Sequence, residues 1–269
     1  MPLVSVIIPC YNQERYIVDA IKSVKRQTFH DYECIIVNDG STDNSKDVIL
    51  SEIADDKRFI LLSKQNEGIC KTRNYGISNS QGKFILPLDG DDIIGETYLE
   101  EAVNVLTSNP NCNIVYCKAE KFGKERGLWH LPKFSMDTML VNNCIFNCAM
   151  FKRDDFNKTI GYNENMSGGV EDWDFWLSIL EQGTNVHCID KVLFYYRIKA
   201  KSRNTALDNI DKKKELFNVM WSNHKELYSK FCPNPVNSSV FCSVLSSPEY
   251  KIGYIICKPL RIIKNLLGL

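Results

Sequence analysis

The sequence of 269 residues lacks the patterns that mark secreted, membrane-spanning or zinc-binding proteins. It has no run of about 18 apolar residues, so no transmembrane helix is predicted. Its first residues, MPLVSVIIP, have no basic region before a short apolar run and are not typical of a signal peptide. Its 11 cysteines are scattered and include no CxxC pair, which argues against a disulfide framework and a zinc module. We therefore expect a cytoplasmic protein with reduced, mostly buried thiols.

An excess of either charge is also missing. Lys and Arg number 33, as do Asp and Glu, so the formal net charge is zero and no nucleic-acid partner is expected. The motifs GxGxxG, GxxxxGK[ST], GxSxG and HExxH are absent, which disfavours dinucleotide dehydrogenases, P-loop enzymes, α/β-hydrolases and zinc proteases. Hydrophobic residues make up 44% of the chain, as is usual for a globular protein with a sizeable core.

What the sequence does contain is an alternation of strand and helix patterns over its first 117 residues. Short runs rich in Val and Ile are typical of strands that are buried on both faces. The expected strands are 3–8, 34–37, 59–62, 84–88 and 113–117. The expected helices are 17–24, one that is capped at 41–43 and carries apolar residues up to position 54, 71–78 and 96–106. This order predicts an α/β fold with βαβ units and a mainly parallel sheet covered on both faces.

The second half of the chain is less regular. Residues 118–170 are rich in turn-forming and polar residues. After them we expect a helix at 171–182, a strand at 192–196 and one long helix at 208–231.

Polar clusters follow three of the predicted strands. They are Pro9-Cys10-Tyr11-Asn12, residues 38–43 (NDGSTD) and residues 89–92 (DGDD). The carboxyl ends of parallel strands meet at one edge of a sheet, so these clusters should converge there. Each cluster alone is compatible with a simple turn, whereas three together favour a ligand site.

Residues 89–92 place three carboxylates within four positions. Such crowding is unfavourable unless a cation neutralises it, and oxygen ligands suit Mg²⁺ or Mn²⁺. This cluster is therefore expected to hold a metal with a diphosphate. A solvated helix cap remains the alternative, above all for Asp92.

Further candidates lie on either side of this cluster. Asp39 could accept a hydrogen bond from a nucleobase imide or a ribose hydroxyl, and Lys71 and Arg73 could meet phosphate or belong to an exposed helix face. Glu171 and Asp172 follow two glycines at the start of a predicted helix. This pair is compatible with a favourable charge at a helix end or with a general base in a cleft.

The segments VSVIIPCYNQ, VNDGSTDNS, QNEGICKTRNYGI, LDGDD and GGVEDWDFWLSI occur in this order between residue 4 and about residue 202. Together they resemble the family 2 glycosyltransferases of the inverting GT-A type. The resemblance implies a GT-A (Rossmann-like) nucleotide-sugar-binding domain over residues 1–205. Its nucleotide-binding half would be 1–117 and its acceptor-binding half 118–205, and residues 206–269 would form a helical C-terminal extension.

The resemblance also implies an activity. The expected enzyme is a non-processive hexosyltransferase that uses a nucleotide-diphospho-sugar, with a UDP-sugar favoured, in bacterial surface or capsular polysaccharide synthesis. The acceptor would be a glycan or a lipid-linked glycan. The implied nucleotide-binding residues are Pro9, Tyr11, Asp39, Asn66 and Arg73.

Four acidic residues receive roles from the same resemblance. Asp89 and Asp91 match the DxD motif, in which Asp91 would bind Mn²⁺ or Mg²⁺ and Asp89 the ribose or the metal shell. Asp172 would be the catalytic base, with Glu171 as its neighbour orienting it or contacting the acceptor.

The sequence departs from the family at one position. Many members carry YR-x-H-x-x-S where this chain has YRIKAKS, so Lys199 replaces a His that often helps to bind metal. A protonated Lys cannot ligate a metal, but Lys199 and Arg197 could both meet the diphosphate. The QxxRW pattern of processive synthases is absent.

Two other functions stay open from the residues. One is a catalytically silent nucleotide-sugar-binding protein, and the other is a nucleotidyltransferase, although the Gly-rich loop with Lys expected for the latter is missing. The segment 248–269 combines an apolar stripe with basic neighbours. It predicts either a helix packed on the catalytic domain or a peripheral contact with the cytoplasmic face of the inner membrane.

Overall fold

The computed structural model describes residues 1–166, 168–199, 210–231, 246–249, 251–253, 255, 257 and 259. The chain divides into two compact units. Unit 1 comprises Met1–Leu131 and Ile145–His224, and unit 2 comprises Pro132–Cys144 and Lys225–Leu269. All of the candidate site residues lie in unit 1.

The first half of unit 1 alternates strands and helices, as the sequence predicts. Its elements are β1 (Val4–Cys10), α1 (Ile17–Lys25), β2 (Tyr32–Asp39), α2 (Ser45–Ile53), β3 (Phe59–Lys64), α3 (Ile69–Ser78), β4 (Phe84–Pro87), β5 (Ile93–Ile94) and α4 (Tyr98–Ser108). Every residue of β1 and β4 is buried, which agrees with their continuous apolar sequences. The two-residue strand β5 is too short to produce a sequence pattern.

The second half of unit 1 differs from the predicted pattern. Its elements are β6 (Ile114–Gly123), β7 (Gly127–Trp129), β8 (Met150–Lys152), α6 (Arg153–Phe156), the 3₁₀ helix η1 (Glu164–Met166), α7 (Glu171–Leu180), β9 (Val186–Ile198) and α8 (Ile210–Asn223). The predicted strands 113–117 and 192–196 are both too short, because β6 and β9 pair with each other from Ile114 and Val186 to Gly123 and Ile198.

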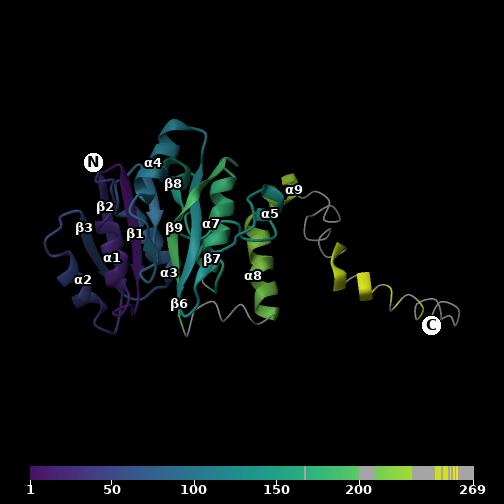
Figure 1. Ribbon diagram of the computed structural model, residues 1–269, viewed down its shortest axis with the longest axis horizontal. Coiled ribbons are helices and arrows are strands. Elements are labelled where there is room, and N and C mark those ends of the chain that lie inside the picture. The colour runs from purple at the N-terminus through teal and green to yellow at the C-terminus, as the bar shows by residue number, and fades with distance from the viewer. Residues whose placement is uncertain are drawn as a thin grey trace. The chain divides into compact units, whose positions relative to one another are not determined.

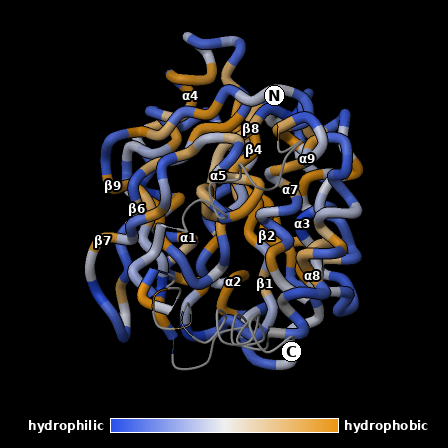
Figure 2. Tube along the Cα trace, turned by 90° about the vertical axis from the view of Figure 1, so that its right-hand side faces the viewer, coloured by the Kyte–Doolittle hydropathy of each residue, from blue (hydrophilic) through white to orange (hydrophobic). Residues whose placement is uncertain are grey.

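The strands form one sheet in the order β3-β2-β1-β4-β8-β6-β9-β5, with β7 paired to β6. Pairing is parallel between β1 and β2, β1 and β4, β2 and β3, and β6 and β9. Each antiparallel pair includes one of the short strands β5, β7 and β8. The expected mainly parallel α/β sheet is thus confirmed, with helices beside it in Figure 1. Figure 2 shows hydrophobic residues along both the strands and the helices.

The parallel strands bring the predicted polar clusters to one edge. β1, β2 and β4 run side by side in the same direction, so the loops after Cys10, Asp39 and Pro87 leave from the same end. Asn12, which has a positive φ of 53°, accepts a hydrogen bond at Oδ1 from the Thr42 backbone N–H at 2.8 Å. The first two clusters are therefore tied together directly.

Unit 2 contains the helices α5 (Met136–Met139) and α9 (Lys225–Phe231). The Tyr228 hydroxyl of α9 donates to the Leu140 carbonyl just after α5, at 2.9 Å. The predicted single helix 208–231 is therefore wrong, because α8 ends at Asn223 and α9 begins at Lys225.

No helix in the described ranges is both long and apolar enough to cross a bilayer. Most of the segment 248–269 lies outside the described residues. Within its described part, Ile252 and Ile255 are exposed.

Candidate active site

The three acids that follow β4 have different surroundings. Asp92 is buried, and its Oδ1 accepts a hydrogen bond from the Arg197 backbone N–H of β9 at 2.8 Å. Burial raises the pKa of Asp92 well above its usual value, and the charges of Asp91 and Asp89 raise it further. Asp92 is thus a buried anchor for β9, not the solvated helix cap that the sequence left as an alternative.

Arg73 of α3 connects two acidic residues that are far apart in the sequence. Its Nη2 donates to Asp89 Oδ1 at 2.7 Å, and its Nη1 donates to Glu171 Oε1 of α7 at 3.0 Å. The Arg73 side chain is only 2% exposed, so the alternative of an exposed helix face is wrong. Burial lowers the pKa of Arg73, but the charges of Asp89 and Glu171 raise it above its usual value. Arg73 therefore remains a cation inside the fold.

Asp172 is the second residue of α7, beside this buried ion pair. Its Oδ1 accepts a hydrogen bond from the Trp173 backbone N–H at 2.8 Å. Burial raises the pKa of Asp172 to about 6, with a further contribution from the charge of Glu171. A carboxylate with a pKa near the working pH is suited to accept a proton during catalysis.

Two cations from the end of β9 meet the acids after β4. Arg197 Nε donates to the Asp91 carbonyl at 2.7 Å, and its Nη2 donates to Asp19 Oδ2 at 2.7 Å. Lys199 Nζ contacts Asp91 Oδ2. Both side chains also lie over the ring of Tyr16, at 4.9 Å for Arg197 and 5.5 Å for Lys199. The two residues predicted to meet phosphate are therefore brought to the predicted metal-binding acids.

Asp39 at the end of β2 braces the loop before α3. Its Oδ1 accepts from Lys64 Nζ at 2.5 Å and from the Glu67 backbone N–H at 3.0 Å, and its Oδ2 accepts from the Gly68 backbone N–H at 3.0 Å. Asp39 is only 4% exposed. A nucleobase imide would have to share these oxygens or displace Lys64.

The other predicted nucleotide residues differ in exposure. Tyr11 and Asn66 are exposed in the loops after β1 and β3, whereas Pro9 is buried within β1. Gly40, with a φ of 68°, packs so closely that a Cβ there would lie 2.8 Å from the Asn66 backbone nitrogen. The loops after β2 and β3 therefore depend on a glycine at position 40.

Two residues of the turn-rich region join the site without having been predicted. Asn147 Nδ2 donates to Asp89 Oδ1 at 3.3 Å, while its buried Oδ1 has no hydrogen-bond partner among the residues that the structure describes. Tyr162 places its ring 5.1 Å from the Arg73 guanidinium. Neither lies in a recognisable motif, so no sequence signal could have identified them.

The donor atoms at this edge fit a divalent cation that is shared with a diphosphate. In the described part of the chain, no three His, Cys, Asp or Glu side chains are grouped closely enough to hold a metal by themselves. Mg²⁺ commonly takes only one or two carboxylates and completes its shell with substrate phosphates and water. Asp89 and Asp91 meet that requirement, although each is already paired with a cation of the chain.

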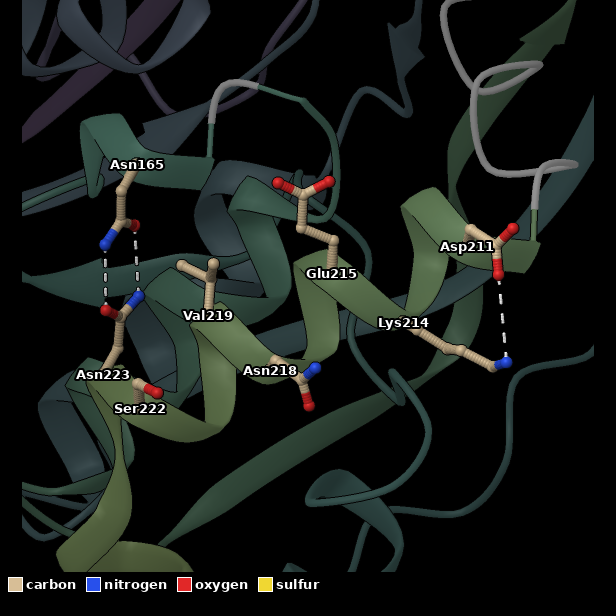
Figure 3. A pocket seen from close by; sticks show the side chains of 8 residues that line it. All are labelled: Asn165, Asp211, Lys214, Glu215, Asn218, Val219, Ser222 and Asn223. Carbon is tan, nitrogen blue, oxygen red and sulfur yellow. Dashed lines mark hydrogen bonds and ion pairs between the residues drawn. The ribbon is translucent and has the colours of Figure 1, made fainter.

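A separate hollow of about 470 Å³ lies between η1 and α8 (Figure 3). Two reciprocal amide hydrogen bonds join Asn165 and Asn223 at its edge, at 2.9 and 3.2 Å. Most of the residues that line it are of polar types, and none of them belongs to the acids after β4 or to the Arg73 ion pairs. It offers no arrangement of acids and bases comparable to that around Arg73.

Several known proteins resemble this chain in sequence. The family model described as "Glycosyl transferase family 2" matches residues 5–160. The chain is 30% identical over 219 residues to a chondroitin synthase of Escherichia coli, covering 80% of this chain but only 31% of that protein. It is also 30% identical over 233 residues to an uncharacterized glycosyltransferase of Rickettsia typhi, covering 82% of this chain and 71% of the relative.

Solved structures show the same fold. Staphylococcus aureus TarS 1–349 in complex with UDP superposes with a TM-score of 0.66 at 19% identity. The match covers 95% of this chain and 78% of the TarS chain. The fold is therefore of the GT-A type, as the sequence predicts.

Proposed function

Because the chain belongs to glycosyltransferase family 2, we propose that it transfers one sugar from a UDP-sugar to a glycan hydroxyl with inversion. The observation that carries the proposal is the Arg73 bridge, which joins Asp89 after β4 to Glu171 at the start of α7. Asp89, which is expected at the sugar donor, is thereby connected to the first turn of α7, which carries the candidate base Asp172. A chondroitin synthase among the relatives and a UDP complex among the structural neighbours support a polysaccharide product and a uridine donor.

In this proposal the nucleoside binds at the loops after β1, β2 and β3. Tyr11 and Asn66 are exposed there and available for contact. Asp39 would accept the uracil imide or a ribose hydroxyl by sharing its oxygens, one of which now holds Lys64, and Pro9 would form the floor of the nucleoside site.

The diphosphate would lie against the acids after β4 and the cations of β9. Asp91 and Asp89 would hold Mn²⁺ or Mg²⁺, which, when bound, stabilises the negative charge on the departing diphosphate. Arg197 and Lys199, which already reach Asp91, would add positive charge to the same side.

Asp172 is assigned the role of the base that accepts the proton of the acceptor hydroxyl. The acceptor hydroxyl oxygen forms a bond to the anomeric carbon while the bond from that carbon to the diphosphate oxygen breaks. Asp172 takes the hydroxyl proton, and the nucleoside diphosphate leaves with the electron pair. Attack from the face opposite the leaving group inverts the anomeric configuration. Glu171 positions this site through its ion pair with Arg73.

A donor panel tests the proposal and separates its alternatives. The protein is incubated with UDP-, GDP- and dTDP-sugars and Mn²⁺, with and without an oligosaccharide acceptor, and the released nucleotide and the product anomer are measured. We expect UDP release and an inverted product. Pyrophosphate release from UTP and a sugar 1-phosphate would identify a nucleotidyltransferase instead, and donor binding without any release would identify a silent binding protein. Tighter binding of GDP than of UDP would contradict the uridine assignment.

A further inference from the structure

Asp91, one of the three acids that follow β4, forms an ion pair with Lys199. Lys199 Nζ contacts Asp91 Oδ2, and the two side chains are only 23% and 15% exposed, respectively. Ion pairs that are shielded from water interact more strongly than pairs on an open surface. This contact is therefore more than an incidental surface pairing.

Lys199 follows the last residue of β9, Ile198, and the contacts of Arg197 near the end of that strand place it. Two residues earlier, the Arg197 backbone N–H donates to Asp92, and the Arg197 side chain donates to the Asp91 carbonyl. Lys199 lies one residue beyond the end of β9, and its ammonium reaches Asp91 Oδ2. Both cations lie over the ring of Tyr16. The backbone contacts thus hold the Lys199 ammonium close to Asp91.

A divalent cation and this ammonium would compete for the same carboxylate. Asp91 Oδ2 is occupied by Lys199, and a metal ion at that oxygen would face a positive charge at contact distance. Both cannot remain there, since like charges in a shielded site repel strongly. A lysine stem has four flexible methylene groups, which allow the ammonium to move to another anion nearby.

We propose that Lys199 is an internal counter-ion of Asp91, which a divalent cation displaces and which then pairs with the donor diphosphate. The second half of this inference rests on the proposed function. Metal alone must break the Lys199 pair without compensation, whereas metal and nucleotide together give the ammonium a new partner. Each ligand should therefore strengthen the binding of the other by the same factor, because coupling between two sites is reciprocal.

The test is calorimetric titration of the full chain with Mn²⁺ alone, with UDP alone and with Mn²⁺ in saturating UDP. Lys199→Gln removes the charge and should raise the affinity for Mn²⁺ alone about five- to tenfold, as expected for removal of a partly shielded repulsion. The same variant should weaken UDP binding and reduce the coupling between Mn²⁺ and UDP. Lys199→Arg, which keeps the charge, should behave more like the unmodified protein.

Two controls make the result specific. Lys191→Gln removes an ion-paired lysine within β9, which binds Glu101 at 3.0 Å, and should change none of the three affinities. In an Asp91→Asn background, Lys199→Gln should have no effect on Mn²⁺ binding, because the shared carboxylate is gone.

The outcomes separate this inference from the proposed function. If the unmodified protein and Lys199→Gln bind Mn²⁺ with the same affinity, or if neither binds it measurably, Lys199 is not a counter-ion that a metal displaces from Asp91. Tighter Mn²⁺ binding in Lys199→Gln without any nucleotide binding supports the counter-ion but contradicts the uridine donor. Sugar transfer with unchanged Mn²⁺ affinity leaves the proposed function standing and rejects the counter-ion alone.

Discussion

Arg73 illustrates how a single buried side chain can define the electrostatics of a site. Its guanidinium pairs with both Asp89 and Glu171, and the Glu171 side chain is only 4% exposed. Loss of Arg73 would leave a buried carboxylate without its partner, which is strongly unfavourable. The positive charge of Arg73 also lowers the pKa of the neighbouring Asp172, whereas burial and Glu171 raise it. The basicity of Asp172 thus depends on the balance among these groups.

The first prediction concerns the ionisation of Asp172. Its pKa is raised to about 6, so a growing fraction is protonated and unable to act as a base as the pH falls below that value. We expect kcat/KM to fall about tenfold per pH unit below this point and to level off above it. Asp172→Asn should lower kcat by roughly 10²–10⁴ with little change in donor affinity.

Asp190→Asn, at an exposed position of β9, serves as the control and should keep the normal profile. If the residual kcat/KM of Asp172→Asn still fell in the same way below pH 6, the titrating group would be a residue other than Asp172.

The sequence identified acids more easily than their partners. Asp89, Asp91 and Asp172 could be proposed because carboxylates at strand ends and helix starts form short motifs. Asn147 and Tyr162 could not, since their contribution depends on how the irregular region folds back against β4 and α3. Residue type and order therefore predicted the charged groups, whereas the surrounding contacts required the tertiary structure.

At the scale of elements, α7 and α8 are joined by a cluster around His224. His224 Nδ1 lies 2.8 Å from Glu181 Oε1, and Nε2 lies 3.2 Å from Asp174 Oδ1. Asn223 Nδ2 donates to the same Asp174 oxygen at 2.7 Å. His224 is 3% exposed. This cluster fixes the end of α8 to the helix whose first turn carries Asp172.

A second prediction follows for stability. Burial lowers the pKa of His224, but hydrogen bonds and charges of Asp174 and Glu181 outweigh it and raise the pKa to about 9. A histidine whose pKa is raised by folding stabilises the folded state. This contribution is fully present below the unfolded pKa of about 6.5 and is lost as the pH rises through the folded pKa of about 9. Urea unfolding at pH 6.5, 8 and 9.5 should therefore show a falling free energy of unfolding.

His224→Gln should reduce stability at pH 6.5 by about 1–3 kcal/mol and flatten this dependence. His187→Gln replaces an exposed histidine of β9 and should change neither quantity. A pH dependence in His224→Gln equal to that of the unmodified chain would contradict the role of the cluster.

The elements that the sequence predicted best are those with continuous apolar runs, such as β1, β2 and β4. β9 was underestimated because its first residues, Val186–Cys188, are largely exposed and carry no regular apolar pattern. The break between α8 and α9 was missed because His224 looks like any polar helix residue until its acidic partners are known. Local pattern predicts an element, while its exact limits depend on what it packs against.

At the scale of the whole chain, the balanced net charge conceals an uneven distribution. No acid follows Glu249, whereas Lys251, Lys258, Arg261 and Lys264 do. Of the described residues there, Ile252 and Ile255 are exposed. Apolar residues with basic neighbours are typical of helices that lie on anionic membranes, where each cation contributes about 1 kcal/mol. We propose a salt-sensitive peripheral contact, in keeping with a lipid-linked acceptor.

Co-sedimentation with vesicles tests this contact. The full chain should pellet with phosphatidylglycerol-containing vesicles at low salt and be released at high salt, because screening weakens surface charges. A chain ending at Ser247 should remain in the supernatant. Vesicles of phosphatidylcholine alone are the control for charge. Equal behaviour of the two chains with anionic vesicles would indicate that residues 248–269 serve packing instead.

The bridge made by Arg73 also bears on how the protein is synthesised. Arg73 and Glu171 are separated by 98 positions, so a ribosome adding about 5–20 residues per second needs roughly 5–20 s to deliver the second acid. During that interval the emerging chain holds a cation destined for the interior with only one of its two acids. We expect the nucleotide-binding half to complete its packing only after α7 has been translated. Premature termination before residue 171 should then yield an aggregation-prone fragment, not an independently folded half-enzyme.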